Sequence, residues 1–500
     1  MSDSQQATHT VFNQSPVFGG HNTWSDDPLL MRIASALPQQ VKTGFAQYGK
    51  WRGAPETQEL ARMANTHTPI LKTHDSKGNR VDTVEFHPSY HAFMRKSVSL
   101  GMHCSTWELA PEENGHRHVA RGVRFYMSGG VEQGHLCPIT MTNACVAALK
   151  QSPDVAQEWL PLITSRKYDP SNKSPVSKAG VTIGMGMTEK QGGTDVRSNT
   201  TKAIPAGDGV WQITGHKWFF SAPMCDAFLV LAQIADKGLG CFLVPRKLSD
   251  GTDNGFRLQR LKDKLGNRSN ASSEVEFHGA YGQLIGEEGK GVQTIIQMVN
   301  MTRLDCAMGS AGLMRAALWE AVEHAHHRQV GGEALINQPL MQRVLADMAL
   351  DVAASTSLAF RLAQAFDRAA ANPAEAAYAR LMTPVIKYWN CKIAPPLVYE
   401  AMECLGGNGY VEEGNLARHF RESPLNGIWE GSGNVMALDV LRVLQKEPET
   451  LDTVLASLER DLGEGSHKTV DVIRTASTMA VSDPGSARIL TEQLALTAGA

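Results

Sequence analysis

The sequence lacks a long apolar run, a signal-peptide pattern and closely paired cysteines. No stretch of about 18 apolar residues occurs, so we expect no membrane-spanning helix. The first residues lack a basic stretch followed by an apolar run, so they do not form a signal peptide. None of the eight cysteines shows C-x-x-C spacing, which argues against a zinc site and predicts that no metal is bound. In a chain this long, such cysteines are typical of buried thiols in the reducing cytoplasm.

A strong net charge is also missing. The formal charge is −3 at pH 7, so no overall field attracts nucleic acid or an anionic membrane. Hydrophobic residues make up 42% of the chain and charged residues 20%, as in an ordinary soluble globular protein. A chain of 500 residues is too long for one core, so about three domains are expected.

The hydrophobic pattern divides the chain into five segments. We expect an irregular extension at 1–40, a helical domain at 41–180, a β-domain at 181–290, a helix bundle at 291–445 and a helical appendix at 446–500. The apolar period changes from helical to two at the third segment and returns to helical at the fourth. The pattern is still helical at the last residue, which predicts a truncated C-terminus.

A glycine-rich stretch at Ile183–Val196 is the strongest local signal. The letters I-G-M-G-M-T-E-K-Q-G-G-T-D-V indicate a strand that opens into a polar loop. Small residues there let backbone N–H groups approach a flat or anionic ligand. A second strand, G-H-K-W-F-F-S at Gly215–Ser221, ends in aromatic residues. Alone, the two stretches also fit a plain pair of hairpins in a β-domain.

Two later segments carry chemistry. In A-M-E-C-L-G-G-N-G-Y (401–410), a helix ends in glycines that expose N–H groups to a phosphate, whereas a plain glycine C-cap would explain only one of the three glycines. In N-G-I-W-E-G-S-G-N-V-M (426–436), Glu430 lies between Trp429 and Gly431. A carboxylate in apolar surroundings has a raised proton affinity, which suits a base that removes a weakly acidic C–H proton. The alternative is a solvated glutamate in a turn.

Together with L-K-D-K-L-G-N-R-S-N-A-S-S-E-V-E-F (261–277) and L-I-G-E-E-G-K-G (284–291), these segments resemble the acyl-CoA dehydrogenase family, in the family's order. T-H-T-V-F-N-Q near the start and C-P-I-T-M-T resemble its alkylation-response, AidB-like branch. The resemblance implies an acyl-CoA dehydrogenase-like fold. That fold has an N-terminal helical domain, a central β-barrel-like domain and a C-terminal four-helix bundle, here with a short helical appendix. It also implies FAD as the cofactor.

The resemblance implies the site residues as well. Glu430 would remove a proton alpha to an activated carbonyl while the β-hydride passes to the flavin, and Arg303 would contact the substrate. The residues expected to bind FAD are Met187, Thr188, Gly193, Thr194, Trp218, Phe219, Ser221, Arg328, Gly406, Gly407, Gly409, Trp429, Ser432 and Asn434. Arg328 and the glycines after 405 would hold FAD phosphates of the neighbouring subunit. We therefore expect a homodimer or homotetramer.

Three departures from the family pattern bear on mechanism. Asn300 replaces the aspartate of D-x-x-R, which in the family helps to hold the pantetheine of acyl-CoA. Thr302 occupies the position where some members carry their base, so Glu430 is the only candidate base. Gly331 replaces the aromatic residue of R-x-x-F-G, which predicts a lost packing contact with FAD. An acyl-CoA substrate is therefore less firmly implied than FAD, and the sequence does not indicate the electron acceptor.

The AidB-like branch suggests an alternative function. Its members are associated with alkylation damage and with double-stranded DNA, which a basic C-terminal helical domain binds. The alternative is a flavoprotein that inactivates alkylating agents or binds double-stranded DNA, with little acyl-CoA turnover. Residues 451–500 carry four Lys/Arg against seven Asp/Glu, the opposite of a DNA-binding surface. DNA binding is therefore the weaker expectation.

Overall fold

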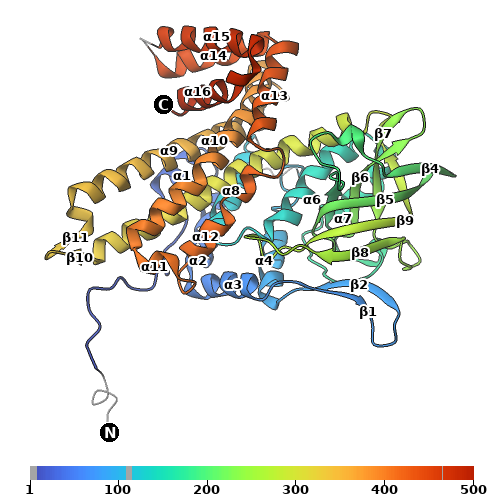
Figure 1. Ribbon diagram of the computed structural model, residues 1–500, viewed down its shortest axis with the longest axis horizontal. Coiled ribbons are helices and arrows are strands. Elements are labelled where there is room, and N and C mark those ends of the chain that lie inside the picture. The colour runs from blue at the N-terminus through green and yellow to red at the C-terminus, as the bar shows by residue number, and fades with distance from the viewer. Residues whose placement is uncertain (1–7, 109–114, 464–465) are drawn as a thin grey trace.

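The computed structural model describes residues 8–108, 115–463 and 466–500. Figure 1 shows a β-domain at one end of the molecule, long helices that run away from it, and a group of helices across the top. This is the fold class that the sequence predicted, with a helical domain first, a β-domain second and a helix bundle third.

The N-terminal domain is built from short helices. They are α1 (Pro28–Ile33), α2 (Gln39–Gly53), α3 (Pro55–Thr66), α4 (Pro88–Ser99), α5 (Arg117–Gly129), α6 (Leu136–Leu149) and α7 (Pro153–Ile163). Proline begins several of them because its fixed φ suits the first helical turn. The helix α6 is buried on nearly every side, which suits its almost entirely apolar sequence. An antiparallel hairpin of β1 (Ile70–His74) and β2 (Arg80–Glu85) interrupts the helices and was not predicted.

The β-domain is a closed barrel. Its strands are β3 (Ile183–Gly186), β4 (Lys202–Gly207), β5 (Val210–Ser221), β6 (Ala227–Ile234), β7 (Gly238–Pro245), β8 (Phe256–Leu261) and β9 (Ser272–Ile285). The order is β3-β6-β4-β5-β9-β7, and β7 pairs back with β6, which closes the sheet. The outer strand β8 pairs with β9.

Long helices form the C-terminal bundle. They are α8 (Gly291–His327), α9 (Pro339–Arg368), α10 (Pro373–Leu405) and α13 (Gly433–Lys446). Although proline usually kinks or breaks a helix, α10 continues through Pro384, Pro395 and Pro396. Short elements connect the long helices: β10 (Gln329–Val330), β11 (Glu333–Ala334), α11 (Gly407–Tyr410) and α12 (Leu416–Glu422). Single 3-10 turns lie at Pro175–Ser177, Val196–Ser198, Leu335–Asn337, Leu425–Gly427 and Pro484–Ser486.

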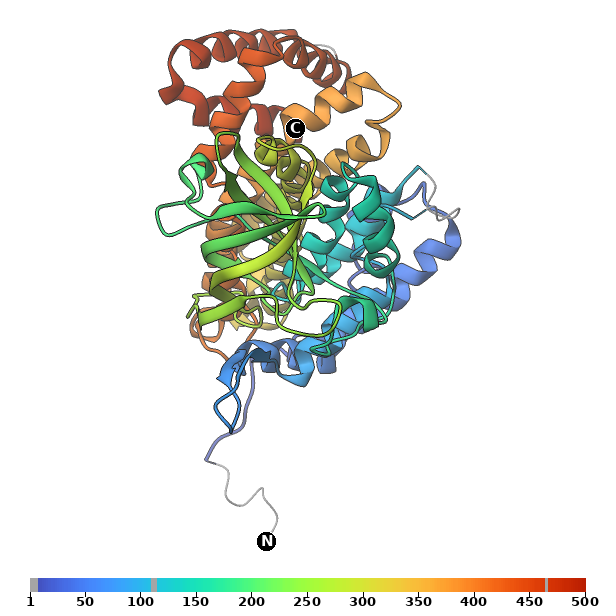
Figure 2. The same cartoon turned by 90° about the vertical axis from the view of Figure 1, so that its right-hand side faces the viewer.

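The last three helices are part of the same core. They are α14 (Glu449–Leu462), α15 (His467–Ser482) and α16 (Ala487–Gly499), and they cover the bundle in Figures 1 and 2. Val454, Leu455 and Leu494 are fully buried in the hydrophobic cluster that α9 and α10 also fill. The appendix therefore shares its core with the bundle. Across the described ranges, no helix is long and apolar enough to span a bilayer.

The helix α8 links the two ends of the molecule. Its first half contacts the barrel strand β7, and its last turn leads into the β10–β11 hairpin at the far end (Figure 1). Arg303 and Arg328 lie 25 residues apart on or just after this helix, which corresponds to roughly 37 Å at 1.5 Å per residue. Residues on α8 can therefore serve two separate places.

Candidate active site

The turn that carries Glu430 has an unusual backbone. Glu430 has a φ of 57° and Gly431 a φ of 101°, both in the region that favours glycine. A non-glycine residue pays about 1–2 kcal/mol for this conformation. The turn lies between a 3-10 turn that ends at Gly427 and the helix α13. Other residues must therefore stabilise it.

Two buried cations hold this turn. The Nζ of Lys387, on α10, donates to the carbonyl oxygens of Trp429 at 2.9 Å and of Gly431 at 2.5 Å. The Nε of Arg303 donates to the carbonyl oxygen of Glu430 at 3.1 Å. Arg303 also forms an ion pair with Asp439 on α13, at 2.8 Å. Three consecutive carbonyl groups are thus fixed from α8 and α10, and the Glu430 side chain is aimed by backbone geometry.

The Glu430 carboxylate retains a raised proton affinity. Burial raises its pKa, and a hydrogen bond from Thr302 and the charges of Arg303 and Lys387 oppose that effect only in part. The Thr302 hydroxyl lies 2.6 Å from Oε2 of Glu430. The backbone N–H of Glu430 donates to no atom in the described ranges. Carboxylate and N–H together offer a base and a donor on one residue.

A second group of side chains lies near this carboxylate. The Cys137 thiol interacts electrostatically with both Glu430 and Lys264. Burial raises the pKa of Cys137 to about 11, so the thiol stays neutral. The amide of Asn270 is almost fully buried, and beyond an interaction with the Cys137 thiol it has no hydrogen-bond partner in the described part of the chain. A buried amide that only a thiol satisfies can still bind a polar ligand.

The glycine-rich loop is fixed by Glu189. This buried carboxylate pairs with Nζ of Lys217 at 2.7 Å and accepts from the Thr201 hydroxyl at 2.6 Å. Burial alone would raise the pKa of Glu189, but Lys217 and the other donors outweigh it and hold the pKa below its usual range. The glutamate of this motif therefore fixes the loop to β5.

The loop that Glu189 fixes is open to a ligand. The backbone N–H of Trp218 donates to the Thr188 carbonyl at 2.8 Å, which joins loop and strand. A Cβ at Gly193 would lie 2.4 Å from the Thr188 hydroxyl, so a larger residue there would displace the Thr188 side chain. The N–H groups of Gly193, Thr194 and Asp195 donate to no atom that the described ranges contain. Free donors beside the exposed Phe219 ring and the half-buried Trp218 ring suit the polar edge of a flavin, so FAD fits this side of the site.

The other residues predicted to bind FAD divide into three groups. Met187 and Ser221 lie on the loop and strand just described, and Phe219 is 55% exposed. Trp429, Ser432 and Asn434 flank Glu430, with the Trp429 indole N–H donating to Asn426 at 2.8 Å. The third group is Arg328, Gly406, Gly407 and Gly409. This group lies at the far end of the bundle, beside β10 and α11, and the single chain does not bring it near Glu430 (Figure 1).

Some functional residues were missed from the sequence. Lys387 belongs to no motif, but a lysine inside the apolar run T-P-V-I-K-Y-W was a signal for a buried cation. Arg303 was predicted to contact substrate. In the structure its contacts are with the Glu430 turn and Asp439, so the substrate contact stays a prediction. Cys137 lies in a motif used only to place the chain within the family.

Three family descriptions match this chain. Residues 13–170 match "Adaptive response protein AidB N-terminal domain". Residues 184–280 match the acyl-CoA dehydrogenase middle domain, and residues 289–445 match its C-terminal domain. The three regions define the class, a protein of acyl-CoA dehydrogenase domains behind an AidB-type N-terminal domain.

Whole-chain relatives agree with that class. AidB of Escherichia coli (strain K12) is 49% identical over 447 residues, which is 89% of this chain and 82% of AidB. Acyl-CoA dehydrogenase family member 11 of Caenorhabditis elegans is 33% identical over 91% of this chain and 77% of its own. The chain therefore belongs to the acyl-CoA dehydrogenase family, in the branch that includes AidB.

Solved structures place the fold in the same family. The crystal structure of Caenorhabditis elegans ACDH-11 in complex with C11-CoA has a TM-score of 0.88 and 28% identity. It matches 100% of this chain and 90% of its own. The resemblance predicted from the motifs is confirmed, and with it an FAD-dependent oxidoreductase that acts on CH–CH groups. The substrate does not follow from the family.

Proposed function

We propose that this protein dehydrogenates an acyl-CoA thioester between its α and β carbons, with Glu430 as the base. The Glu430 turn carries this proposal. A carboxylate of raised pKa stands on a strained turn that Lys387 and Arg303 hold from two helices. A solvated glutamate would need no such support.

The residues of the chain divide the work. Glu430 accepts the proton from the α carbon, and its raised pKa brings its proton affinity closer to that of a weak carbon acid. The free backbone N–H of Glu430 is available to stabilise negative charge on the thioester oxygen. Thr302 keeps the carboxylate oriented through its hydroxyl. Arg303 and Lys387 position Glu430 indirectly, because they hold the carbonyl groups of its turn.

FAD, when bound, supplies the acceptor for the β-hydride. The loop around Thr188 and Gly193, with Trp218 and Ser221 on β5, would hold the flavin ring. Arg328 and the glycines after 405 would hold the phosphates of FAD in a second copy of the chain, because they lie at the opposite end of their own subunit. This division supports a homodimer or a homotetramer.

Further properties follow as proposals. The C11-CoA in the ACDH-11 structure supports an acyl-CoA of medium length as the first substrate to test. All eight cysteines are unpaired and buried, which supports a reducing compartment such as the cytoplasm.

Anaerobic mixing tests the proposal. The FAD-loaded protein is mixed with acyl-CoAs of increasing chain length, C11-CoA included, and flavin absorbance is followed. We expect bleaching that Glu430→Gln slows by roughly 10²–10⁴-fold with FAD still bound. Glu287→Gln is the control, because that side chain is 71% exposed at the entry to α8. No bleaching with any acyl-CoA would refute the proposal.

A second candidate is a role in the response to alkylation damage. The match of residues 13–170 to the AidB N-terminal description and the 49% identity to AidB favour it. In this case the flavoprotein would inactivate alkylating agents or bind double-stranded DNA. A gel shift with duplex DNA that weakens as salt rises would support DNA binding, and no shift at low salt would exclude it.

A further inference from the structure

The N-terminal segment reaches the far end of the bundle. The side-chain amide of Asn13 donates to the carbonyl oxygen of Gln329 at 2.8 Å. The N–H of Gln329 donates back to Oδ1 of Asn13 at 2.7 Å. The two bonds match those that a neighbouring strand would make, and they fix the first residue of β10. Asn13 itself has a φ of 55°, which asparagine tolerates better than most residues.

Asn13 also forms a hydrogen bond with the Arg328 guanidinium. The carbonyl oxygen of Asn13 accepts from Nη1 of Arg328 at 2.8 Å. Arg328 is half-buried and forms no ion pair with a carboxylate in the part of the chain that the structure describes. A guanidinium that is held by a neutral carbonyl keeps its full charge for an anion.

The next two residues extend the contact to the glycine-rich turn. Oε1 of Gln14 accepts from Nδ2 of Asn408 at 3.2 Å, inside the segment G-G-N-G. The Ser15 hydroxyl lies 3.0 Å from Nδ1 of His324, in the last turn of α8. Residues 13–15 therefore add a polar bridge between the end of α8 and the turn after α10, two helix ends that also pack directly on each other through Ala325 and Ala401.

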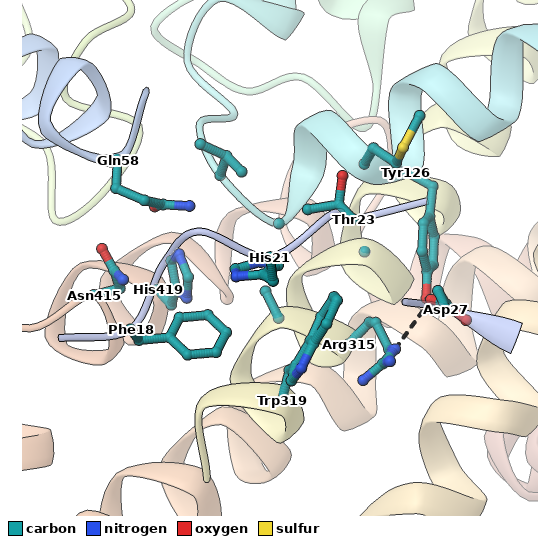
Figure 3. Close-up of a pocket in the computed structure, with 15 residues that line it drawn as sticks. Phe18, His21, Thr23, Asp27, Gln58, Tyr126, Arg315, Trp319, Asn415 and His419 are labelled. Atoms are coloured by element: carbon teal, nitrogen blue, oxygen red, sulfur yellow. Dashed lines mark hydrogen bonds and ion pairs between the residues drawn. The ribbon is translucent and has the colours of Figure 1, made fainter. Parts of the chain in front are cut away.

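The segment is anchored further along. In Figure 3 the His21 ring lies beside Phe18 and Trp319, with ring centroids 4.6 and 4.3 Å apart. Asp27 then forms an ion pair with Arg315 at 3.0 Å. The cavity beneath is only about 30 Å³, room for one or two waters. Because residues 18–27 are closely seated, residues 13–15 are presented at a fixed place.

We propose that residues 13–15 are positioning residues for FAD. They orient Arg328 and the segment G-G-N-G toward the FAD phosphates of the neighbouring subunit. The inference rests on the proposed assignment of Arg328 and these glycines to the phosphates. Residues 13–15 also support the end of α8, close to the position where Gly331 replaces the aromatic residue of the family pattern. In this chain, the N-terminal segment therefore provides a supporting contact that the aromatic residue would otherwise supply.

Flavin titration of the apo-protein tests the inference. Asn13→Gly keeps the backbone conformation and removes both side-chain bonds to Gln329. We expect it to weaken FAD binding about tenfold, the effect of losing one or two net hydrogen bonds. Binding of riboflavin, which has no phosphate, should stay the same, as should the melting temperature of the apo-protein. Thr10→Ala is the control in the same segment, and Arg328→Ala reports on the phosphate assignment.

The outcomes distinguish a failure of the proposal for residues 13–15 from a failure of the phosphate assignment of Arg328. If Arg328→Ala weakens FAD binding and Asn13→Gly does not, the inference is wrong and the assignment stands. If Arg328→Ala leaves FAD binding unchanged, both are wrong. If Asn13→Gly weakens riboflavin as much as FAD, the segment has a general structural role and the inference is again wrong. Selective loss of FAD affinity in both variants supports it.

Discussion

The Glu430 turn and the Arg328 end of the bundle are built in opposite ways. At the turn, buried cations satisfy consecutive carbonyl groups, and Lys387 is only 1% exposed. At the bundle end, Arg328 is half-buried and holds a carbonyl, and a Cβ at Gly406 would meet nothing within 4 Å. One region is complete within a single chain, whereas the other leaves donors and space unused.

This difference in how far each region is already satisfied indicates which partner completes it. A base must be in place before the substrate arrives, so its support is internal and rigid. The proposed phosphate-binding end can be left open if FAD and a second subunit complete it. Substitutions at the turn should therefore change the rate of chemistry, and substitutions at the bundle end should change the affinity for FAD.

Among substitutions outside Glu430 itself, the largest effect is expected at Lys387. Lys387→Met keeps most of the side-chain volume and leaves the carbonyls of Trp429 and Gly431 without their donor. A misplacement of about 1 Å costs on the order of 10²-fold in rate, so flavin bleaching should slow by about that factor. Lys392→Met, an exposed site on the same helix, is the control. A larger loss in FAD affinity than in rate would break the contrast between the two regions.

A smaller effect is expected at Gly406. This residue has a φ of 60° and a ψ of −138°, so alanine there costs about 1–3 kcal/mol of backbone strain without a clash. FAD affinity should fall about tenfold or more, while the bleaching rate at saturating FAD is retained. Gly78→Ala applies similar strain in the β1–β2 turn, where φ is 83°, and should leave FAD affinity unchanged. Equal FAD affinity in the two variants would contradict the assignment of Gly406.

A shift in pH dependence is expected at Thr302. Its hydroxyl lowers the pKa of Glu430, so Thr302→Val should raise that pKa further. Glu430 must be deprotonated to act, so the acid limb of the bleaching rate should move to higher pH and the plateau at high pH should change little. The measurement is the bleaching rate across a pH series. An unmoved limb would mean that the hydroxyl donates to the Val299 carbonyl, 2.9 Å away.

The smallest effect is expected at His21, which anchors the N-terminal segment that reaches the Arg328 end of the bundle. Burial lowers the pKa of His21 from 6.5, helped by Arg315 and opposed by Asp26 and Glu323. The docked state therefore binds fewer protons than the released state, and docking weakens as pH falls below 6.5. FAD should dissociate somewhat faster from the wild type at about pH 5 than at about pH 8. In His21→Phe, which keeps the ring contacts but cannot be protonated, this dependence should be reduced.

Local signals were enough to predict the fold class and to single out Glu430 as the proposed base. The loop at Ile183–Val196 and the segment around Glu430 are contiguous, so their chemistry can be inferred from neighbouring letters. The closing of the barrel by β6 and β7 and the role of Lys387 depend on residues that only the fold brings together. The β1–β2 hairpin was missed because its strands are short and largely polar, although the S-K-G-N turn was visible.

Glu189 and Asn13 show a second limit to what a sequence motif predicts, namely the role of each side chain. Both lie in motifs that placed the chain in its family, yet the motif did not say what each side chain does. Glu189 serves the loop through a buried pair with Lys217, and Asn13 serves residues more than three hundred positions away. A motif reports that a residue type is needed at a position, and only the contacts give the reason.

The bonds of the N-terminal segment also constrain the order of events during synthesis. Gln14 and Asn408 are separated by 394 residues. At roughly 5–20 residues per second, the ribosome needs on the order of 20–80 seconds between the two. During that time the contact between Gln14 and Asn408 cannot form, whereas the barrel can already close. The contact between Gln14 and Asn408 is therefore among the later ones to form, and the proposed phosphate-binding site cannot be complete until Gly406, Gly407 and Gly409 have left the ribosome.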